Sequence, residues 1–253
     1  MNNSTNTLLN YRVVGNGYPV VFLHGFLESI SMWEYLSLSQ NNQKILIDLP
    51  GHGTSDFTKT TLFSMQSVAK EVKRVIDELN IQEYHLVGHS MGGYIGIELI
   101  KIDVRCDKLI LLNSNFWEDN EQKKIDRLRI SNVVKTNKKL FIYEAIPNLF
   151  LDPRANNTEI TALIEEAVAI NSETIALFSI AMSKRKNNTN FVLKNANRIL
   201  IIQGKEDPII SSEKMRKSLE ECSLKIDLLD NCGHMGHIEK SYDVATAISN
   251  WLS

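Results

Sequence analysis

The chain has 253 residues, of which 43% are hydrophobic and 23% are charged, a composition typical of one folded domain with a sizeable core. Its 28 basic and 30 acidic side chains leave a formal net charge of −2, which gives no electrostatic basis for binding nucleic acid or an anionic membrane. No apolar run approaches the roughly 20 residues that a membrane-spanning helix needs.

Residues 1–6 contain neither the basic segment nor the apolar segment of a secretory signal, so we expect the chain to stay in the cytoplasm. The three cysteines, Cys106, Cys222 and Cys232, are too few and too scattered for a disulfide framework or a zinc ribbon. We therefore expect neither a metal nor a cofactor. The sequence does not indicate an oligomeric state.

Short β-branched runs alternate with longer segments of helical period, which is the pattern of an α/β fold with a mainly parallel sheet. Several of the runs are apolar throughout, as is typical of strands that are covered on both faces. The predicted strands are Leu8–Val14, Val20–Leu23, Lys44–Leu49, Tyr84–Val87, Lys108–Leu112, Arg198–Gln203 and Lys225–Leu229.

A turn signal and one strongly amphipathic segment add detail to this pattern. Gly15-Asn16-Gly17 between the first two strands is typical of a tight hairpin, so we expect the sheet to open with an antiparallel strand. From about Ser64 to Asn80, apolar side chains recur at helical spacing with charged side chains opposite them. This segment is predicted to be a helix packed against the sheet.

The alternation of strands and helices stops between about Asn115 and Asn197. No convincing strand appears there, and four amphipathic helical stretches follow one another. The sequence thus predicts an α/β core formed by residues 1–114 and 198–253, with an all-helical insertion at residues 115–197.

The fourth predicted strand leads into Gly88-His89-Ser90-Met91-Gly92, which fits Gly-x-Ser-x-Gly at a sharp turn from strand to helix. A serine held in a strained conformation at such a turn needs neighbours without a Cβ, here Gly88 and Gly92. The following helix directs N-terminal amides, that of Met91 among them, at an oxyanion forming beside Ser90. Taken alone, the motif also fits a structural serine at a helix start.

A nucleophilic serine requires a base, and six histidines are candidates. His234 follows the last strand in a glycine-flanked loop, at the edge where open α/β sheets bind their ligands, and is the predicted base. His237 lies in the same loop and is interpreted as a capping or lining side chain. A metal site of Cys232, His234 and His237 would lack a fourth ligand at zinc-like spacing.

The base in turn requires a carboxylate, and Asp207 is the predicted one. It follows the strand Arg198–Gln203 and precedes Pro208, which restricts its backbone to an extended or turn conformation. Glu206 is its neighbour and the weaker candidate. The loop after the strand Lys108–Leu112 offers no acid, and Asp48 is interpreted as a residue that organises its own loop.

Ser90, Asp207 and His234 follow one another in this order, each at the carboxyl end of a strand, and together they resemble the α/β-hydrolase family. The resemblance covers nearly the whole chain outside residues 115–197. It is carried by five ordered motifs: His24-Gly25-Phe26, Asp48-Leu49-Pro50-Gly51-His52-Gly53-Thr54-Ser55, Gly88-His89-Ser90-Met91-Gly92-Gly93, Gly204-Lys205-Glu206-Asp207 and Gly233-His234-Met235-Gly236-His237-Ile238-Glu239.

The resemblance implies a mostly parallel, doubly wound sheet of the α/β-hydrolase type, with a helical cap at residues 115–197 that covers the nucleophile and shapes the substrate pocket. It also implies that the backbone N–H of Phe26 joins that of Met91 in an oxyanion hole, with His24 ordering the loop. Several apolar side chains are candidates to line the acyl pocket, although a place in the cap core fits them equally well: Trp33, Phe116, Trp117, Tyr143 and Phe150.

Single positions separate the chain from some branches of this family. Haloalkane dehalogenases and epoxide hydrolases of the fold carry an aspartate where this chain has Ser90. The lyase of the menaquinone pathway typically has an arginine four residues after the nucleophile, where this chain has Tyr94. The chain therefore resembles the acyl-transfer, carboxylesterase-like branch.

These observations predict a cofactor-independent serine hydrolase that cleaves small carboxylic esters or thioesters through an acyl-enzyme intermediate, with no nucleic-acid or membrane partner. Because the triad determines the mechanism but not the electrophile, three alternatives are a C–C bond hydrolase, a perhydrolase and a lyase like that of the menaquinone pathway. A ligand receptor built on a hydrolase scaffold is the fourth.

Overall fold

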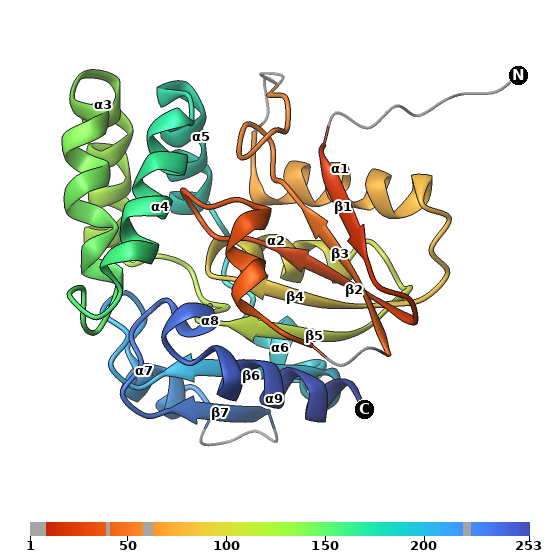
Figure 1. Cartoon of the computed structure of the whole chain (residues 1–253). Helices are drawn as coiled ribbons and strands as arrows, with labels where there is room; N and C mark the ends of the chain where they lie inside the picture. Colours follow the sequence, from red (N-terminus) through yellow and green to blue (C-terminus); the bar gives the residue numbers. More distant parts are fainter. Residues whose placement is uncertain (1–8, 39–40, 58–62, 220–223) are drawn as a thin grey trace, which may run out of the picture.

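One sheet of seven strands forms the centre of the computed structural model, which describes residues 9–38, 41–57, 63–219 and 224–253 (Figure 1). The sequence predictions for residues 1–6, Leu8 and Cys222 lie outside the described residues. All seven predicted strands are present, with ends that differ by a few residues. In spatial order they are β1 (Tyr11–Val14), β3 (Asn42–Ile47), β2 (Tyr18–Leu23), β4 (Tyr84–His89), β5 (Cys106–Leu112), β6 (Ile199–Gly204) and β7 (Lys225–Leu229).

The strands from β3 to β7 in this order pair in parallel, and β1 is antiparallel to β3. An antiparallel strand therefore opens the sheet as predicted, but the predicted hairpin is wrong because β3 lies between β1 and β2. Gly15 and Gly17 have the positive φ angles of a turn, yet a turn signal does not determine which strand becomes the partner. The side chains of β1 are mostly exposed and suit an edge, whereas β2 is buried and suits the centre.

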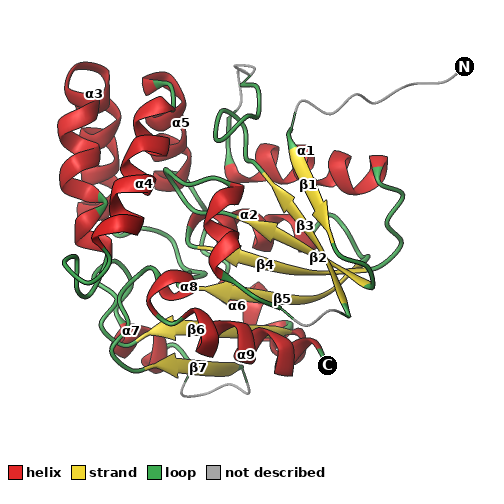
Figure 2. Cartoon of the chain, in the orientation of Figure 1, coloured by secondary structure: helices red, strands yellow, loops and turns green. Residues whose placement is uncertain are grey.

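Helices cover both faces of the sheet and also gather at one end of it (Figure 2). Along the described residues, no helix combines the length and the apolar character needed to cross a membrane. The α-helices are α1 (Met65–Glu78), α2 (Met91–Ile100), α3 (Glu121–Ala145), α4 (Asn157–Ala169), α5 (Ser172–Ser183), α6 (Thr189–Lys194), α7 (Ser212–Lys217), α8 (Gly236–Glu239) and α9 (Ser241–Leu252), and the 3-10 helices are η1 (Ile30–Tyr35), η2 (Pro147–Leu149) and η3 (Ala196–Arg198).

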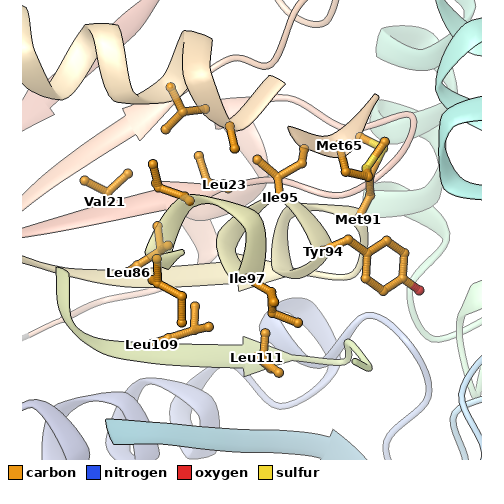
Figure 3. Packing of buried hydrophobic residues seen from close by; sticks show 14 of the residues in the cluster. Val21, Leu23, Met65, Leu86, Met91, Tyr94, Ile95, Ile97, Leu109 and Leu111 are labelled. Carbon is orange, nitrogen blue, oxygen red and sulfur yellow. The ribbon is translucent and has the colours of Figure 1, made fainter. Parts of the chain in front are cut away.

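Alternate side chains of the strands enter two separate hydrophobic cores. Leu23 of β2 packs in the core that contains α1 and α2, where Figure 3 shows Ile95 of α2 close to the strand side chains. Phe22 of β2 packs in the core on the other face, with η1 and α9. This burial on both faces explains why the strands read as continuous apolar runs, and it gives the doubly wound arrangement that the sequence predicts.

Helix α1 shows how the sequence builds one of these layers. Ser64 Oγ accepts a hydrogen bond from the Ser67 N–H at 3.1 Å, and Ser67 Oγ accepts one from the Ser64 N–H at 2.9 Å, which forms a capping box. The predicted apolar stripe, with Val68, Val72 and Ile76 among its members, is fully buried against the sheet. The predicted helix at residues 64–80 is thereby confirmed.

Residues 115–197, all of which the structure describes, lie between β5 and β6 and contain no strand. Helices α3, α4 and α5 lie beside one another beyond the carboxyl ends of the strands (Figure 1). Their buried side chains form a third hydrophobic cluster, which also includes Leu27 from the loop after β2 and Met235 from the loop after β7. The division into a core and a cap at residues 115–197 stays a proposal.

Candidate active site

Ser90 lies at the turn from β4 into α2, in a backbone conformation that strains any residue with a side chain. Its φ is +48° and its ψ is −113°. Two glycines let the chain close this turn: a Cβ on Gly88 would lie 2.6 Å from the backbone of Gly92, and a Cβ on Gly92 would overlap the backbone of Leu23 in β2. Close packing of β2, β4 and α2 therefore fixes the position of Ser90.

Three side chains from three loops form a hydrogen-bonded row at the carboxyl edge of the sheet. His234 Nε2 lies 3.0 Å from Ser90 Oγ, and His234 Nδ1 lies 2.8 Å from Asp207 Oδ2. The loops follow β4, β6 and β7, and parallel pairing brings the ends of these strands to one edge. The structure thus brings together the three residues that the sequence order predicts as a triad.

Asp207 is held as a carboxylate by its surroundings. Besides the bond to His234, it accepts four hydrogen bonds of 2.8 to 3.0 Å, from Asn113 Nδ2, Gln203 Nε2 and the backbone N–H groups of Ile209 and Ile210. Burial alone would raise the pKa of Asp207, but the His234 ring and these donors hold the pKa well below its usual value.

An ionised Asp207 also determines the state of the His234 ring. Because a carboxylate only accepts hydrogen bonds, Nδ1 of His234 carries the hydrogen and donates it to Asp207. The lone pair of Nε2 then faces Ser90 Oγ and can take its proton, while Asp207 stabilises the ring cation that results. The arrangement can therefore activate a serine hydroxyl as a nucleophile.

The two predicted oxyanion-hole residues lie in neighbouring loops, since Phe26 follows β2, Met91 begins α2 after β4, and these strands pair. Within the part of the chain that the structure describes, neither backbone N–H donates to another protein group. The loop of Phe26 is ordered by His24, whose Nδ1 donates to Gly25 O at 2.8 Å and whose Nε2 accepts from the Leu49 N–H at 2.9 Å. Both amides are therefore available to an oxyanion.

The structure also places two further residues considered from the sequence, His237 and Asp48. His237 caps no helix, since Met235 is the N-cap of α8; its ring is fully buried against the rings of His89 and Trp33. Asp48 joins three segments through hydrogen bonds of 2.8 to 3.1 Å that it accepts from Asn10 Nδ2, Ile30 N–H and Thr54 N–H.

The five aromatic side chains predicted as pocket candidates do not come together. Trp33 and Phe116 are 1% and 2% exposed and fill the cores on opposite faces of the sheet, because each occupies the space between strands and covering helices. Trp117 borders one of these cores, and Tyr143 lies 58% exposed on α3. Phe150 packs in the cluster that contains Phe26 and Met235, beside the row.

Three polar side chains around the row are not predicted from the sequence. Asn113 and Gln203 both donate to Asp207, and Glu28 Oε2 lies 2.9 Å from His89 Nδ1, next to Ser90. Asn113 follows the apolar strand β5 and Gln203 lies near the end of β6, so a polar residue at a strand end is the signal that could have identified them. For Glu28 the sequence offers no such signal.

Within the described residues, no group of three or more His, Cys, Asp or Glu side chains is arranged to hold a metal ion. Cys232, a member of the metal site considered from the sequence, is fully buried, and burial raises the pKa of its thiol to about 12. The thiol is therefore protonated at neutral pH and is a poor metal ligand in this state.

Comparisons with known proteins agree with this fold. A family model described as alpha/beta hydrolase fold matches residues 18–133. Monoacylglycerol lipase abhd6-B of Xenopus laevis is 24% identical over 94% of this chain and 76% of its own length. A thermophilic esterase from Thermogutta terrifontis superposes with a TM-score of 0.88 and 25% identity over 96% of this chain and 92% of its own. The esterase EaEST from Exiguobacterium antarcticum shares the fold, with a TM-score of 0.86 and 21% identity over 97% of this chain and 96% of its own.

Proposed function

The chain belongs to the α/β-hydrolase fold family, and we propose that within it the protein is a serine hydrolase that cleaves small carboxylic esters through an acyl-enzyme intermediate. The observation that carries this proposal is the row in which His234 lies 3.0 Å from Ser90 Oγ and 2.8 Å from Asp207. A serine becomes a nucleophile at neutral pH only when such a base takes its proton.

The geometry assigns each group a step. Ser90 Oγ attacks the acyl carbon while His234 Nε2 takes the proton, and the backbone N–H groups of Phe26 and Met91 hold the oxygen that becomes negative. His234 then returns the proton to the leaving alcohol, which breaks the ester bond and leaves the acyl group on Ser90. Water activated by His234 attacks that acyl group and releases the carboxylic acid.

The surroundings of the row favour an apolar acyl group. Leu27, Met235 and Phe150 belong to one hydrophobic cluster, against which Phe26 and Ile238 pack. This cluster continues into the buried faces of α3, α4 and α5, so an acyl chain placed there would exchange water for apolar contacts. Small esters or thioesters with an apolar acyl group are therefore the proposed substrates.

A carboxylated substrate, as the lyase alternative requires, finds little support. The residue four positions after Ser90 is Tyr94, and the Arg185 guanidinium lies 4.2 Å from the centre of its ring. Arg185 pairs at 2.8 Å with Asp119, which also lies 3.4 Å from Arg127. Asp119 supplies one negative charge against these two arginines, so what disfavours a carboxylated substrate is Tyr94 at the position where that lyase has an arginine.

A panel of p-nitrophenyl esters with increasing acyl length tests the proposal. We expect turnover that is highest for short to medium acyl chains and lost in Ser90→Ala by at least about a thousandfold. A fluorophosphonate probe should label the wild type at Ser90 and leave Ser90→Ala unlabelled.

Three outcomes would count against the proposed function. Labelling without turnover of any ester would indicate another electrophile, such as a ketone in C–C bond hydrolysis or a peroxide acceptor in a perhydrolase reaction. Absence of both labelling and turnover would indicate a receptor with an unactivated serine. Labelling that persisted in Ser90→Ala would refute Ser90 as the nucleophile.

A further inference from the structure

We propose that Glu28 and His89 form a buried ion pair that positions the oxyanion loop, the nucleophile turn and the base loop against one another. This inference rests on the proposed function, since it assigns the pair a positioning role for that chemistry. Glu28 lies in the loop after β2 and His89 is the last residue of β4, and both are almost completely buried, with 4% of Glu28 and 0% of His89 exposed.

The pair contacts all three parts of the site. Glu28 Oε2 accepts hydrogen bonds from the Gly25 N–H at 2.5 Å and from His89 Nδ1 at 2.9 Å, and His89 Nε2 lies 3.0 Å from the backbone oxygen of His234. Gly25 directly precedes Phe26 of the proposed oxyanion hole, and His89 directly precedes Ser90. The pair therefore fixes the residues that precede Phe26 and Ser90, and it contacts the backbone of His234.

The partners of His89 determine its charge. Its two ring nitrogens face a carboxylate oxygen and a carbonyl oxygen, both of which only accept hydrogen bonds, so both nitrogens must carry hydrogen. A ring with two N–H groups is a cation, and Glu28 is its counter-ion. Burial opposes both charges, but their mutual attraction outweighs it, raises the pKa of His89 and lowers that of Glu28 to about 2.

The backbone at Gly25 is shaped to admit this pair. A Cβ at this position would lie 2.5 Å from Glu28 Oε2 and 2.8 Å from His89 Nδ1, too close for any side chain. The glycine of the His24-Gly25-Phe26 motif thus leaves the space that the carboxylate and the ring occupy. Any residue larger than glycine would push the pair apart.

The ion pair also places a charge beside the base. The ring centres of His89 and His234 lie 5.2 Å apart. The other titratable groups around His89 are His24, His237 and Asp207. His24 and His237 are kept neutral because burial lowers their pKa values, and Asp207 is the fixed partner of His234.

Glu28→Gln tests this role because it keeps the shape of the side chain and removes the carboxylate charge. The Gly25 N–H and His89 Nδ1 both contact Oε2 of Glu28, so one amide group cannot accept from Gly25 and donate to His89 at that position. We expect kcat to fall about tenfold with little change in KM, because the three loops lose their common contact. The matched control is Glu213→Gln, which removes an acidic group that is 77% exposed on α7 and should leave kcat unchanged.

A second measurement needs neither a variant nor turnover. In protein labelled with ¹⁵N-histidine, one of the six histidine rings should carry two N–H protons at pH 8, and contacts with the amide protons of Gly25 and Ser90 would assign it to His89. A single N–H on that ring, or a kcat of Glu28→Gln equal to that of the wild type, would overturn the inference. If the wild type neither turns over esters nor labels with the fluorophosphonate, the proposed function fails instead, whatever the state of His89.

Discussion

Asn113 has a role at the scale of single residues that its position in the chain does not reveal. It lies directly after β5 with a φ of +43°, a conformation that asparagine tolerates better than most residues. This backbone places its amide so that Nδ2 donates at 3.0 Å both to Asp207 Oδ2 and to Gly233 O. One amide therefore fixes the acid and the loop that carries the base.

We predict that Asn113→Ala lowers kcat for esters by about five- to thirtyfold with little change in KM, because Asp207 loses a donor that favours its charged form and the base loop loses a contact. The matched control is Asn115→Ala, which removes an amide of the same loop that contacts Tyr94 rather than Asp207. Equal losses in the two variants, measured on folded protein, would contradict a specific role for Asn113.

The sequence predicts the residues of the row better than it predicts their partners. Ser90, Asp207 and His234 could be identified because each lies in a short motif at the carboxyl end of a strand, and strand ends share one edge of a parallel sheet. No local motif marks Glu28, whose partner His89 lies 61 residues away in the chain, and the strand end at Asn113 is a signal that does not name Asp207, 94 residues away, as its partner. Which amide or carboxylate reaches which ring depends on loop conformations that local sequence does not determine.

Among the secondary-structure elements, α4 is tied to the loop after β2 by one carboxylate. Ser29 Oγ donates to Glu166 Oε2 at 2.8 Å, and Ser31 Oγ donates to Glu166 Oε1 at 2.6 Å. The same loop carries Phe26 of the proposed oxyanion hole. Glu166 therefore links the helices of residues 115–197 to the site across 135 residues of chain or more.

We predict that Glu166→Ala lowers the free energy of unfolding by about 1 to 2 kcal/mol and speeds hydrogen exchange in α4, because two hydroxyl groups lose a charged acceptor. The neighbouring Glu165→Ala, whose side chain points to solvent, is the control and should change neither quantity. Exchange rates in α4 that match the wild type in both variants would show that the link is unimportant.

The elements themselves follow from local sequence more closely than their packing does. The stripe of α1 is visible because it is long and periodic, and most of the central strands are visible because they are short apolar runs buried on both faces. The partner of β1 was missed because Gly15-Asn16-Gly17 determines a turn but not a ladder. The helical content of residues 115–197 was visible, whereas the cluster that joins it to Leu27 and Met235 depends on contacts between distant segments.

At the scale of the whole molecule, the formal net charge of −2 does not describe the titratable groups that the fold buries. Burial lowers the pKa values of four histidines, His24, His52, His85 and His237, to about 3 for His52 and about 4 for His85. Composition places all six histidines near pH 6.5, and only the fold separates these four from His89. The dependence of stability on pH is therefore set by the structure.

We predict that the protein loses stability steeply below pH 6.5. A histidine that is neutral in the folded state and protonates when unfolded stabilises the fold above its ordinary pKa, and this contribution is lost as the pH falls toward its folded pKa. Each such group contributes a loss of up to about 1.4 kcal/mol per pH unit between its ordinary pKa and its folded pKa, which burial lowers to about 3 for His52 and about 4 for His85.

Urea titrations from pH 7 to pH 4 measure this slope, and His52→Gln isolates one contributor. His52 Nδ1 lies 3.1 Å from Pro50 O and Nε2 has no partner among the described residues, so a glutamine amide can keep the one hydrogen bond and cannot take up a proton. The slope between pH 6 and pH 4 should fall by about one proton, or roughly 1.4 kcal/mol per pH unit. A slope equal to that of the wild type would mean that His52 is already protonated in the folded protein and that burial does not control the titration of this group.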